Sequence, residues 1–149
     1  MVKRKLDPNK FLTEGEKGRV TRAIREAEKM TSGEIRVFLD RKTGGDLRKQ
    51  AERTFEKLGM TRTQLRNGVL IYISLSDHKF VVLGDRGIHE KVGENFWQDV
   101  VSRIEPAFSR ADFAKGLEEG MGMIGEKLKA HFPYRGSDVN ELPDEIGGN

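Results

Sequence analysis

Hydrophobic residues in the first part of the chain recur with the period of a helix that buries one face. They are spaced at i, i+3, i+4 and i+7, as follows: Val20, Ala23, Ile24, Ala27 and Met30. Thr13 and Glu16 precede this run at the spacing of a capping box, in which each side chain hydrogen-bonds the backbone of the other residue. The pattern therefore predicts a helix that begins after Thr13 and ends before the turn residues 31–33.

Two strands and a second helix are predicted in the next stretch. Apolar residues alternate over 35–39, as they do in a strand. Asp46 is placed to cap a helix with an apolar inner face, and Gly59 is placed to end that helix. Residues 68–75 then form a near-continuous apolar run, which is typical of a central strand covered on both faces.

The second half of the chain begins with a hairpin pattern. A short polar turn at 76–79 leads into the apolar residues 80–83, so we expect the second and third strands to be antiparallel. Apolar residues at helical spacing then predict a helix before Pro106 and a last helix that ends at Pro133.

This order of elements predicts an α/β fold with a small mixed sheet of three to four strands and helices on both faces. The first two strands should be parallel, joined by a right-handed crossover through a helix. A length of 149 residues suits one domain, which we assign to residues 12–132. Residues 1–11 are expected to form a flexible N-terminal segment, and residues 133–149 a flexible acidic tail.

Composition narrows the class of protein. The net charge of +3 comes from 27 basic and 24 acidic residues that are interspersed, which is typical of a solvated surface rather than a nucleic-acid site. The absence of cysteine excludes disulfides, thiolate metal sites and a cysteine nucleophile. No apolar run reaches the length of a signal peptide or of a membrane span. We expect a cytoplasmic monomer that binds no nucleic acid.

Common catalytic and cofactor motifs are missing or lie in the wrong context. Residues 120–125 match the G-x-G-x-x-G string of dinucleotide sites, but they lie inside the last predicted helix, where glycines favour close packing of helices. The histidines, His78, His89 and His131, do not form an i, i+4 metal pair. The chain also has no G-x-S-x-G elbow, so no activated nucleophile is visible.

Acidic residues in the predicted loops are the remaining candidates for chemistry. Asp40 and Asp46 bound the loop after the first strand, and Asp77 lies in the turn after the second strand. Ligands of such sheets bind beyond the carboxyl ends of the parallel strands, which is where these three residues should lie. Asp85 follows the third strand, which runs the other way, so it should lie at the other rim beside Asn67 with its carboxylate exposed. Oxygen ligands of this kind suit calcium or magnesium, although the same residue types also cap turns.

Landmarks along the chain resemble, in the same order, those of the TPM domain, described in thylakoid lumen, photosystem and receptor-modulator proteins. The matching segments are Leu12-Thr13 with Glu16, residues 31–37, residues 67–71, Asp77, residues 84–88 and residues 113–116. The resemblance runs from about Leu12 to Leu128. The chain lacks the signal sequence and transmembrane tail of the better-known members, so we expect a stand-alone cytoplasmic member of that family.

The resemblance implies a three-layer α/β/α sandwich, divalent metal binding in the loops of some members, and an acid-phosphatase assignment for the plant lumen branch. It makes Asn67, Asp77 and Asp85 candidate metal ligands, whereas Asp40 and Asp46 join them by topology alone. We therefore expect a module that binds calcium or magnesium and acts as an accessory or protein-interaction domain.

Two alternatives stay open. One is a weak metal-dependent phosphomonoester hydrolase, in which one or two of these carboxylates hold the ion and Arg86 contacts phosphate. Against it, the chain has no Asp-x-Asp pair, no Arg-His-Gly string and no dense His/Asp cluster. The other is a structural interaction domain that binds no metal.

Overall fold

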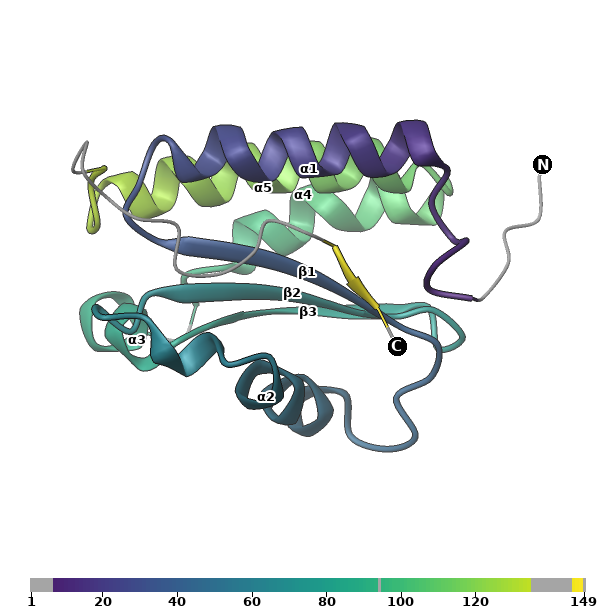
Figure 1. The fold of residues 1–149 in the computed structure, drawn as a ribbon, viewed down its shortest axis with the longest axis horizontal. Helices are drawn as coiled ribbons and strands as arrows, with labels where there is room; N and C mark the ends of the chain where they lie inside the picture. Colours follow the sequence, from purple (N-terminus) through teal and green to yellow (C-terminus); the bar gives the residue numbers. More distant parts are fainter. Residues whose placement is uncertain (1–6, 94, 135–145, 149) are drawn as a thin grey trace.

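The computed structural model of the chain describes residues 7–93, 95–134 and 146–148 (Figure 1). Within these ranges it contains five α-helices, one short 3₁₀ helix and four strands. Their order is α1 (Glu14–Glu28), β1 (Glu34–Asp40), α2 (Leu47–Lys57), η1 (Met60–Arg62), β2 (Gly68–Ser74), β3 (Lys79–Gly84), α3 (Arg86–Val92), α4 (Gln98–Ser109), α5 (Phe113–Lys129) and β4 (Gly147–Gly148).

The four strands form one mixed sheet in the order β3-β2-β1-β4. β1 and β2 are parallel, and β2 and β3 are antiparallel, as the sequence predicts. β4 pairs in parallel with the outer edge of β1 and comes from the segment predicted to be a tail. At the other end of the predicted domain, Phe11 is buried and its ring packs edge-on against Phe113. The packed part of the chain therefore extends beyond residues 12–132 in both directions.

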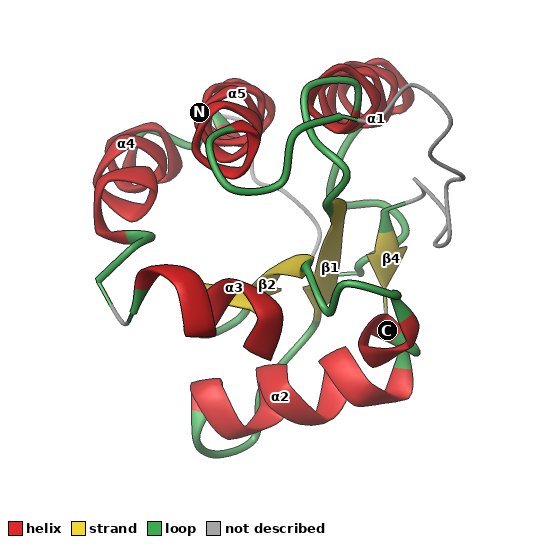
Figure 2. Ribbon diagram, turned by 90° about the vertical axis from the view of Figure 1, so that its left-hand side faces the viewer, coloured by secondary structure: helices red, strands yellow, loops and turns green. Residues whose placement is uncertain are grey.

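Helices cover both faces of the sheet, so the predicted α/β class is confirmed. α1, α4 and α5 lie on one face, α2 lies on the other, and α3 lies at the end of β3 (Figures 1 and 2). Alternate residues of β1 face the two layers: Val37 and Leu39 belong to the larger core, whereas Phe38 belongs to a smaller core with Phe55 of α2. This alternation explains why β1 and β2 are apolar on both faces.

Local signals of the sequence are realised in the structure. Thr13 and Glu16 form the capping box of α1, and the Asp46 side chain caps α2. The glycine string of residues 120–125 lies inside α5. A Cβ at Gly120 would lie 2.6 Å from the Ile104 side chain of α4, so the prediction of close helix packing is confirmed there.

The region after β3 differs from the sequence prediction in two respects. Helix α3, which follows Asp85 directly, was not predicted, because its seven residues are too few to show a helical period. Pro106 lies inside α4 and does not end it. A proline removes one helical hydrogen bond to the residue four positions earlier, and here both Pro106 and Ser102 are exposed, so solvent can satisfy that carbonyl.

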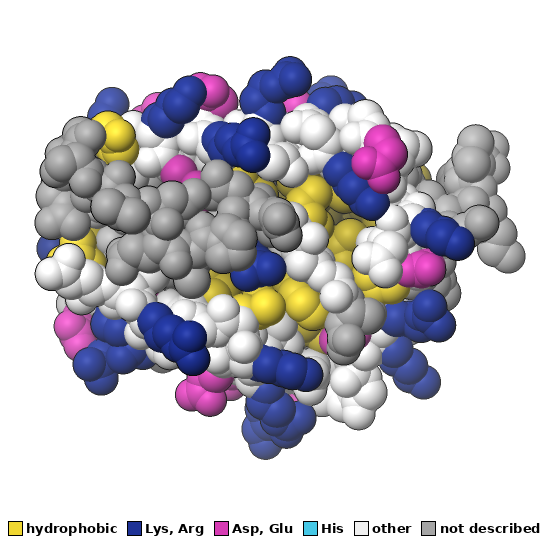
Figure 3. All heavy atoms as spheres, viewed as in Figure 1, with side chains coloured by type: hydrophobic (Ala, Val, Ile, Leu, Met, Phe, Trp, Pro, Cys, Tyr) yellow, Lys and Arg dark blue, Asp and Glu magenta, His cyan; other side chains and the backbone are white. Residues whose placement is uncertain are grey.

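Lys and Arg side chains are spread over the face shown in Figure 3, with Asp and Glu side chains among them. None of the helices in the described parts of the chain combines the length and the apolar composition that crossing a membrane requires.

Candidate functional site

The strand register divides the predicted site residues between two rims of the sheet. At one rim the carboxyl ends of β1 and β2 meet the start of β3, because Asp40 pairs with Ser74, and Ser74 pairs with Lys79. At the other rim the starts of β1 and β2 meet the end of β3. We call these the carboxyl rim, which holds Asp40, Asp46 and Asp77, and the opposite rim, which holds Asn67, Asp85 and Arg86.

A hollow opens at the carboxyl rim between the loop after β1 and the turn after β2. It is lined by residues from both connections: Lys42, Thr43, Gly44, Gly45, Asp46, Leu47, Asp77 and Lys79. Asp46 and Asp77 supply its two carboxylates and both are exposed. The loop turns at Gly44, whose φ of 72° is readily adopted only by glycine. The structure therefore brings these two acidic residues, 31 positions apart, to one hollow.

Asp77 ties the hairpin turn to the loop after β1. Its Oδ2 accepts a hydrogen bond from Ser74 Oγ at 2.7 Å and another from the Thr43 backbone N–H at 3.3 Å. These bonds favour the ionised carboxylate and, with Lys42 and Lys79 nearby, they hold the pKa of Asp77 below its ordinary value. Asp77 is therefore a fixed anion at physiological pH.

Asp46 combines a capping bond with an open oxygen. Its Oδ1 accepts the backbone N–H of Lys49 at 2.9 Å, which satisfies one of the first N–H groups of α2. Within the described residues, no hydrogen bond involves Asp46 Oδ2 or Asp77 Oδ1. Each carboxylate therefore has one oxygen outside the hydrogen bonds of the described residues.

Asp40 belongs to the floor of this rim and does not line the hollow. It is 6% exposed and accepts a hydrogen bond from the Tyr72 hydroxyl. Burial, and then this bond to the Asp40 carboxylate, raise the pKa of Tyr72 well above its ordinary value. The pair joins β1 to β2 beneath the loops, which is a supporting role.

At the opposite rim, Asp85 is buried, and the prediction of an exposed carboxylate is wrong. The residue is 7% exposed. Its two oxygens accept hydrogen bonds from Arg66 Nε at 2.6 Å and Arg66 Nη2 at 2.9 Å, and Oδ1 also accepts the backbone N–H of Arg86 at 2.8 Å. The carboxylate is buried because it both pairs with a guanidinium and caps α3.

The other two predicted residues of this rim do not reach the hollow either. Asn67 is buried, its backbone N–H donates to Thr63 Oγ1 at 3.2 Å, and its Nδ2 donates to Ser32 Oγ at 3.4 Å. Arg86 is exposed as the first residue of α3. Arg86 and the two carboxylates of the hollow thus lie at different ends of the sheet, so they do not form one phosphate-and-metal site.

Among the described residues, the carboxyl rim has carboxylate oxygens outside any hydrogen bond, whereas both oxygens of Asp85 at the opposite rim are bonded. In residues 7–93, 95–134 and 146–148, no three His, Cys, Asp or Glu side chains come together as a metal-binding group. Asp46 and Asp77 could be completed by backbone carbonyls of residues 41–46 and by water, ligands that calcium and magnesium accept. Lys42 and Lys79 line the same hollow and oppose a cation electrostatically.

Sequence reasoning missed the residues that position Asp77. Ser74 reads as the end of an apolar strand, and Thr43 as a loop residue. The available signal is the spacing of Ser74 and Asp77 across a tight turn, since short polar side chains commonly bond to each other and to the backbone there.

Comparisons with known proteins agree with this architecture. The sequence profile of the TPM domain matches residues 6–127. The NMR structure of the BA42 protein from the psychrophilic bacterium Bizionia argentinensis is similar, with 41% identity over 94% of this chain and 97% of that one, and a TM-score of 0.88.

A more distant structure shares the fold alone. The N-terminal domain of a protein from P. gingivalis is 18% identical, covers 83% of this chain and 81% of that one, and has a TM-score of 0.67. Comparison with curated protein sequences finds no significant match.

Proposed function

Because the chain belongs to the TPM domain family, we propose that it is an accessory or interaction module that binds a divalent cation, calcium or magnesium, at its carboxyl rim. One observation carries this proposal. Asp46 and Asp77 come from separate connections, line one hollow, and each keep a carboxylate oxygen outside the hydrogen bonds of the described residues.

The expected affinity is low because the two carboxylates are offset by two lysines. A site of this kind binds calcium at about 10⁻⁴–10⁻³ M, the range of weak oxygen sites. In this proposal Asp40 supports the rim from below, and Asp85 and Asn67 hold the other end of the sheet together. The cation would draw the loop of residues 41–46 toward the hairpin turn. Binding would then change the shape of the carboxyl rim without any catalytic step.

A calcium titration of the ¹⁵N-labelled chain tests the proposal. Amide shifts should saturate near millimolar calcium and concentrate in residues 41–46 and 76–79. Asp46→Asn and Asp77→Asn should each weaken binding at least about tenfold, which corresponds to ~1.4 kcal/mol. At a hundredfold excess over Kd the fold should gain ~2.7 kcal/mol, or roughly 5–10 °C in Tm.

Three controls make the titration specific. Potassium chloride at equal ionic strength measures general screening. Glu52→Gln removes an exposed carboxylate of α2 that does not line the hollow, and should leave the affinity unchanged. Asp85→Asn should also retain it; a selective loss of calcium affinity in a folded Asp85→Asn chain, with Asp77→Asn unaffected, would move the site to the opposite rim.

Phosphatase assays of the Asp46→Asn and Asp77→Asn variants test the hydrolase alternative. We expect little or no hydrolysis of an aryl phosphate, because Arg86, the candidate phosphate contact, lies at the other rim from the carboxylates of the hollow. Magnesium-dependent turnover near the ~10 s⁻¹ median of enzymes, abolished in both Asp46→Asn and Asp77→Asn, would favour the hydrolase instead.

A further inference from the structure

The two outer edges of the sheet differ in how they are covered. The outer edge of β1 is paired with β4, so a segment of this chain already adds a strand there. β3 is the last strand in the order β3-β2-β1-β4, and no strand of the described residues pairs with its outer edge. An edge strand of this kind is a template for another extended segment.

The hydrogen-bond pattern shows which backbone groups of β3 face outward. The Asp85 N–H donates to the Gly68 carbonyl of β2, which makes these two residues a hydrogen-bonded pair. Such pairs alternate along an antiparallel ladder, so the backbone groups of Phe80, Val82 and Gly84 point away from β2. Three residues of β3 therefore present N–H and C=O groups to a strand that approaches from outside.

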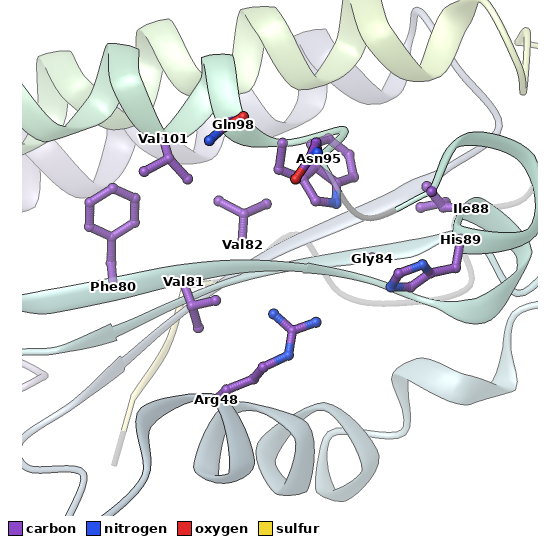
Figure 4. Close-up of a pocket in the computed structure, with 12 residues that line it drawn as sticks. Arg48, Phe80, Val81, Val82, Gly84, Ile88, His89, Asn95, Gln98 and Val101 are labelled. Carbon is purple, nitrogen blue, oxygen red and sulfur yellow. The ribbon is translucent and has the colours of Figure 1, made fainter.

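A groove of about 230 Å³ runs along this edge (Figure 4). On the side of α4, its lining is mainly apolar, from Phe80, Val82 and Val101, with Asn95 and Gln98 beside them (Figure 4). Trp97, the residue before α4, belongs to the same apolar cluster. Trp97 packs beside the last residue of β3, because a Cβ at Gly84 would lie 3.2 Å from its indole Nε1. This side fits the apolar side chains of an added strand.

The other side of the edge is basic. Arg48 of α2 reaches toward β3 on the side where Val81 points, and His89 of α3 lies near Gly84 (Figure 4). The described residues that line the groove include no aspartate or glutamate. Because side chains of a strand alternate between the two faces of a sheet, an added strand would present every second residue to Arg48.

From these observations we propose that the β3 edge binds an extended segment of a protein partner in which apolar and acidic residues alternate. The segment adds a strand to the sheet, with its apolar side chains toward Trp97 and Val101 and its carboxylates toward Arg48. This proposal specifies a class of partner for the interaction role proposed above, and so it rests on that role. It does not depend on the cation site, because no residue of that hollow lines the groove.

The test uses the full chain and capped eight-residue peptides. In the first peptide valine and glutamate alternate, in the second valine and lysine alternate, and the third repeats the first with proline at two central positions. Trp97 is the only tryptophan, so its fluorescence reports on the groove directly. We expect the glutamate peptide to change the emission saturably, and the lysine and proline peptides to bind at least about tenfold more weakly.

Amide hydrogen exchange separates strand addition from adsorption. The N–H groups of Phe80, Val82 and Gly84 should exchange more slowly with the glutamate peptide, whereas those of Val81 and Leu83, which already face β2, should not change. Equal effects on all five amides, or none at millimolar peptide, would overturn the proposal, whatever the calcium titration shows.

Charge reversal supplies the matched variants. Arg48→Glu changes an exposed residue of α2. It should weaken binding of the glutamate peptide at least about tenfold and strengthen binding of the lysine peptide. Arg53→Glu lies on the same helix outside the groove lining and should change neither. Equal binding of both charged peptides to the unmodified chain would contradict the predicted chemistry. Protection of the same outward amides without peptide, rising with protein concentration, would make a second copy the occupant and overturn the proposal.

Discussion

The two rims of the sheet hold similar polar residues but use them in opposite ways. At the opposite rim, the Asp85 carboxylate takes three hydrogen bonds from Arg66 and the start of α3, and Asn67 is bonded and buried. At the carboxyl rim, Asp46 and Asp77 each spend one oxygen on the fold and keep the other in an exposed hollow. The difference lies in how far the fold already satisfies each carboxylate.

This difference follows from what each rim has to hold together. At the opposite rim, backbone hydrogen bonds join the end of β3 and the start of α3 to the segment that leads into β2. Gly87 N–H donates to the Arg66 carbonyl at 2.9 Å, and Asp85 N–H donates to the Gly68 carbonyl at 2.9 Å. A buried carboxylate is tolerated there because its partners are fixed beside it. Substitutions at the opposite rim should therefore cost stability, and substitutions in the hollow should cost ligand affinity.

The largest effect is expected for Gly87→Ala. A Cβ at this position would lie 2.6 Å from the Arg66 carbonyl oxygen and still closer to that of Leu65, and both contacts are backbone atoms that cannot rotate away. We expect a loss of about 3 kcal/mol of unfolding free energy, measured by urea denaturation, or roughly 10 °C in Tm.

Gly18→Ala is the matched control for that variant. Gly18 lies in α1, and a Cβ added there would meet nothing within 4 Å beyond the backbone of its own helix, so alanine should stabilise the helix by about 0.5–1 kcal/mol. If Gly87→Ala left the unfolding free energy unchanged, the opposite rim would be deformable and the contrast between the rims would disappear.

A smaller loss is expected for Asp85→Asn. Asparagine still caps a helix well, so the change mainly weakens the charge-assisted bonds to Arg66. Because Arg66 is 29% exposed, solvent compensates in part, and we expect a loss of about 1–2 kcal/mol by urea denaturation.

Asp46→Asn makes the comparison direct. It is the same exchange at another helix cap, but no hydrogen bond or ion pair with an arginine is present at Asp46 among the described residues. Its unfolding free energy should stay within about 0.5 kcal/mol of the unmodified chain. Equal losses in the two variants would show that the ion pair with Arg66 adds no stability at Asp85 beyond what the cap at Asp46 has.

The sequence was sufficient for most of the sheet and its layers. The two periods of apolar residues locate β1, β2, α1 and α5, and the hairpin spacing sets β3 antiparallel to β2. β4 could not be predicted, because Gly147–Gly148 has no apolar pattern and its pairing with β1 is a contact between distant parts of the chain. The division of the candidate residues between two rims did follow from strand direction alone.

The burial of Asp85 could not be read from the sequence. Asp46 can be predicted as a cap because an amphipathic helix of eleven residues follows it. Asp85 is followed only by the seven residues of α3, which are too few to show a helical pattern. Its partner Arg66 is nineteen positions away in a loop and has a positive φ of 50°, which no local pattern indicates. Residue type therefore identified the polar residues correctly but not which of them the fold had already satisfied.

The smallest effect is a change in the pH dependence of stability on removal of the Asp77 charge. Hydrogen bonds from Ser74 and the Thr43 N–H lower the pKa of Asp77 in the folded chain below its ordinary value near 3.8. In acid, the unfolded chain therefore takes up this proton first, and stability falls as protons are added. The contribution of Asp77 is fully present above about pH 5 and is lost as the pH falls through the folded pKa.

Urea denaturation from pH 6 to pH 2.5 measures this contribution by comparing the unmodified chain with Asp77→Asn. The two unfolding free energies should differ most near neutral pH and converge in acid, because protonated aspartate and asparagine are both uncharged. Ser74→Ala should reduce the pH dependence of the unfolding free energy in part, since it removes the principal hydrogen bond that lowers the pKa of Asp77. A constant difference at every pH would mean that Asp77 supports the turn by shape alone. In that case the carboxyl rim would resemble the opposite rim, with its polar groups committed to the fold and no fixed anion kept for a cation.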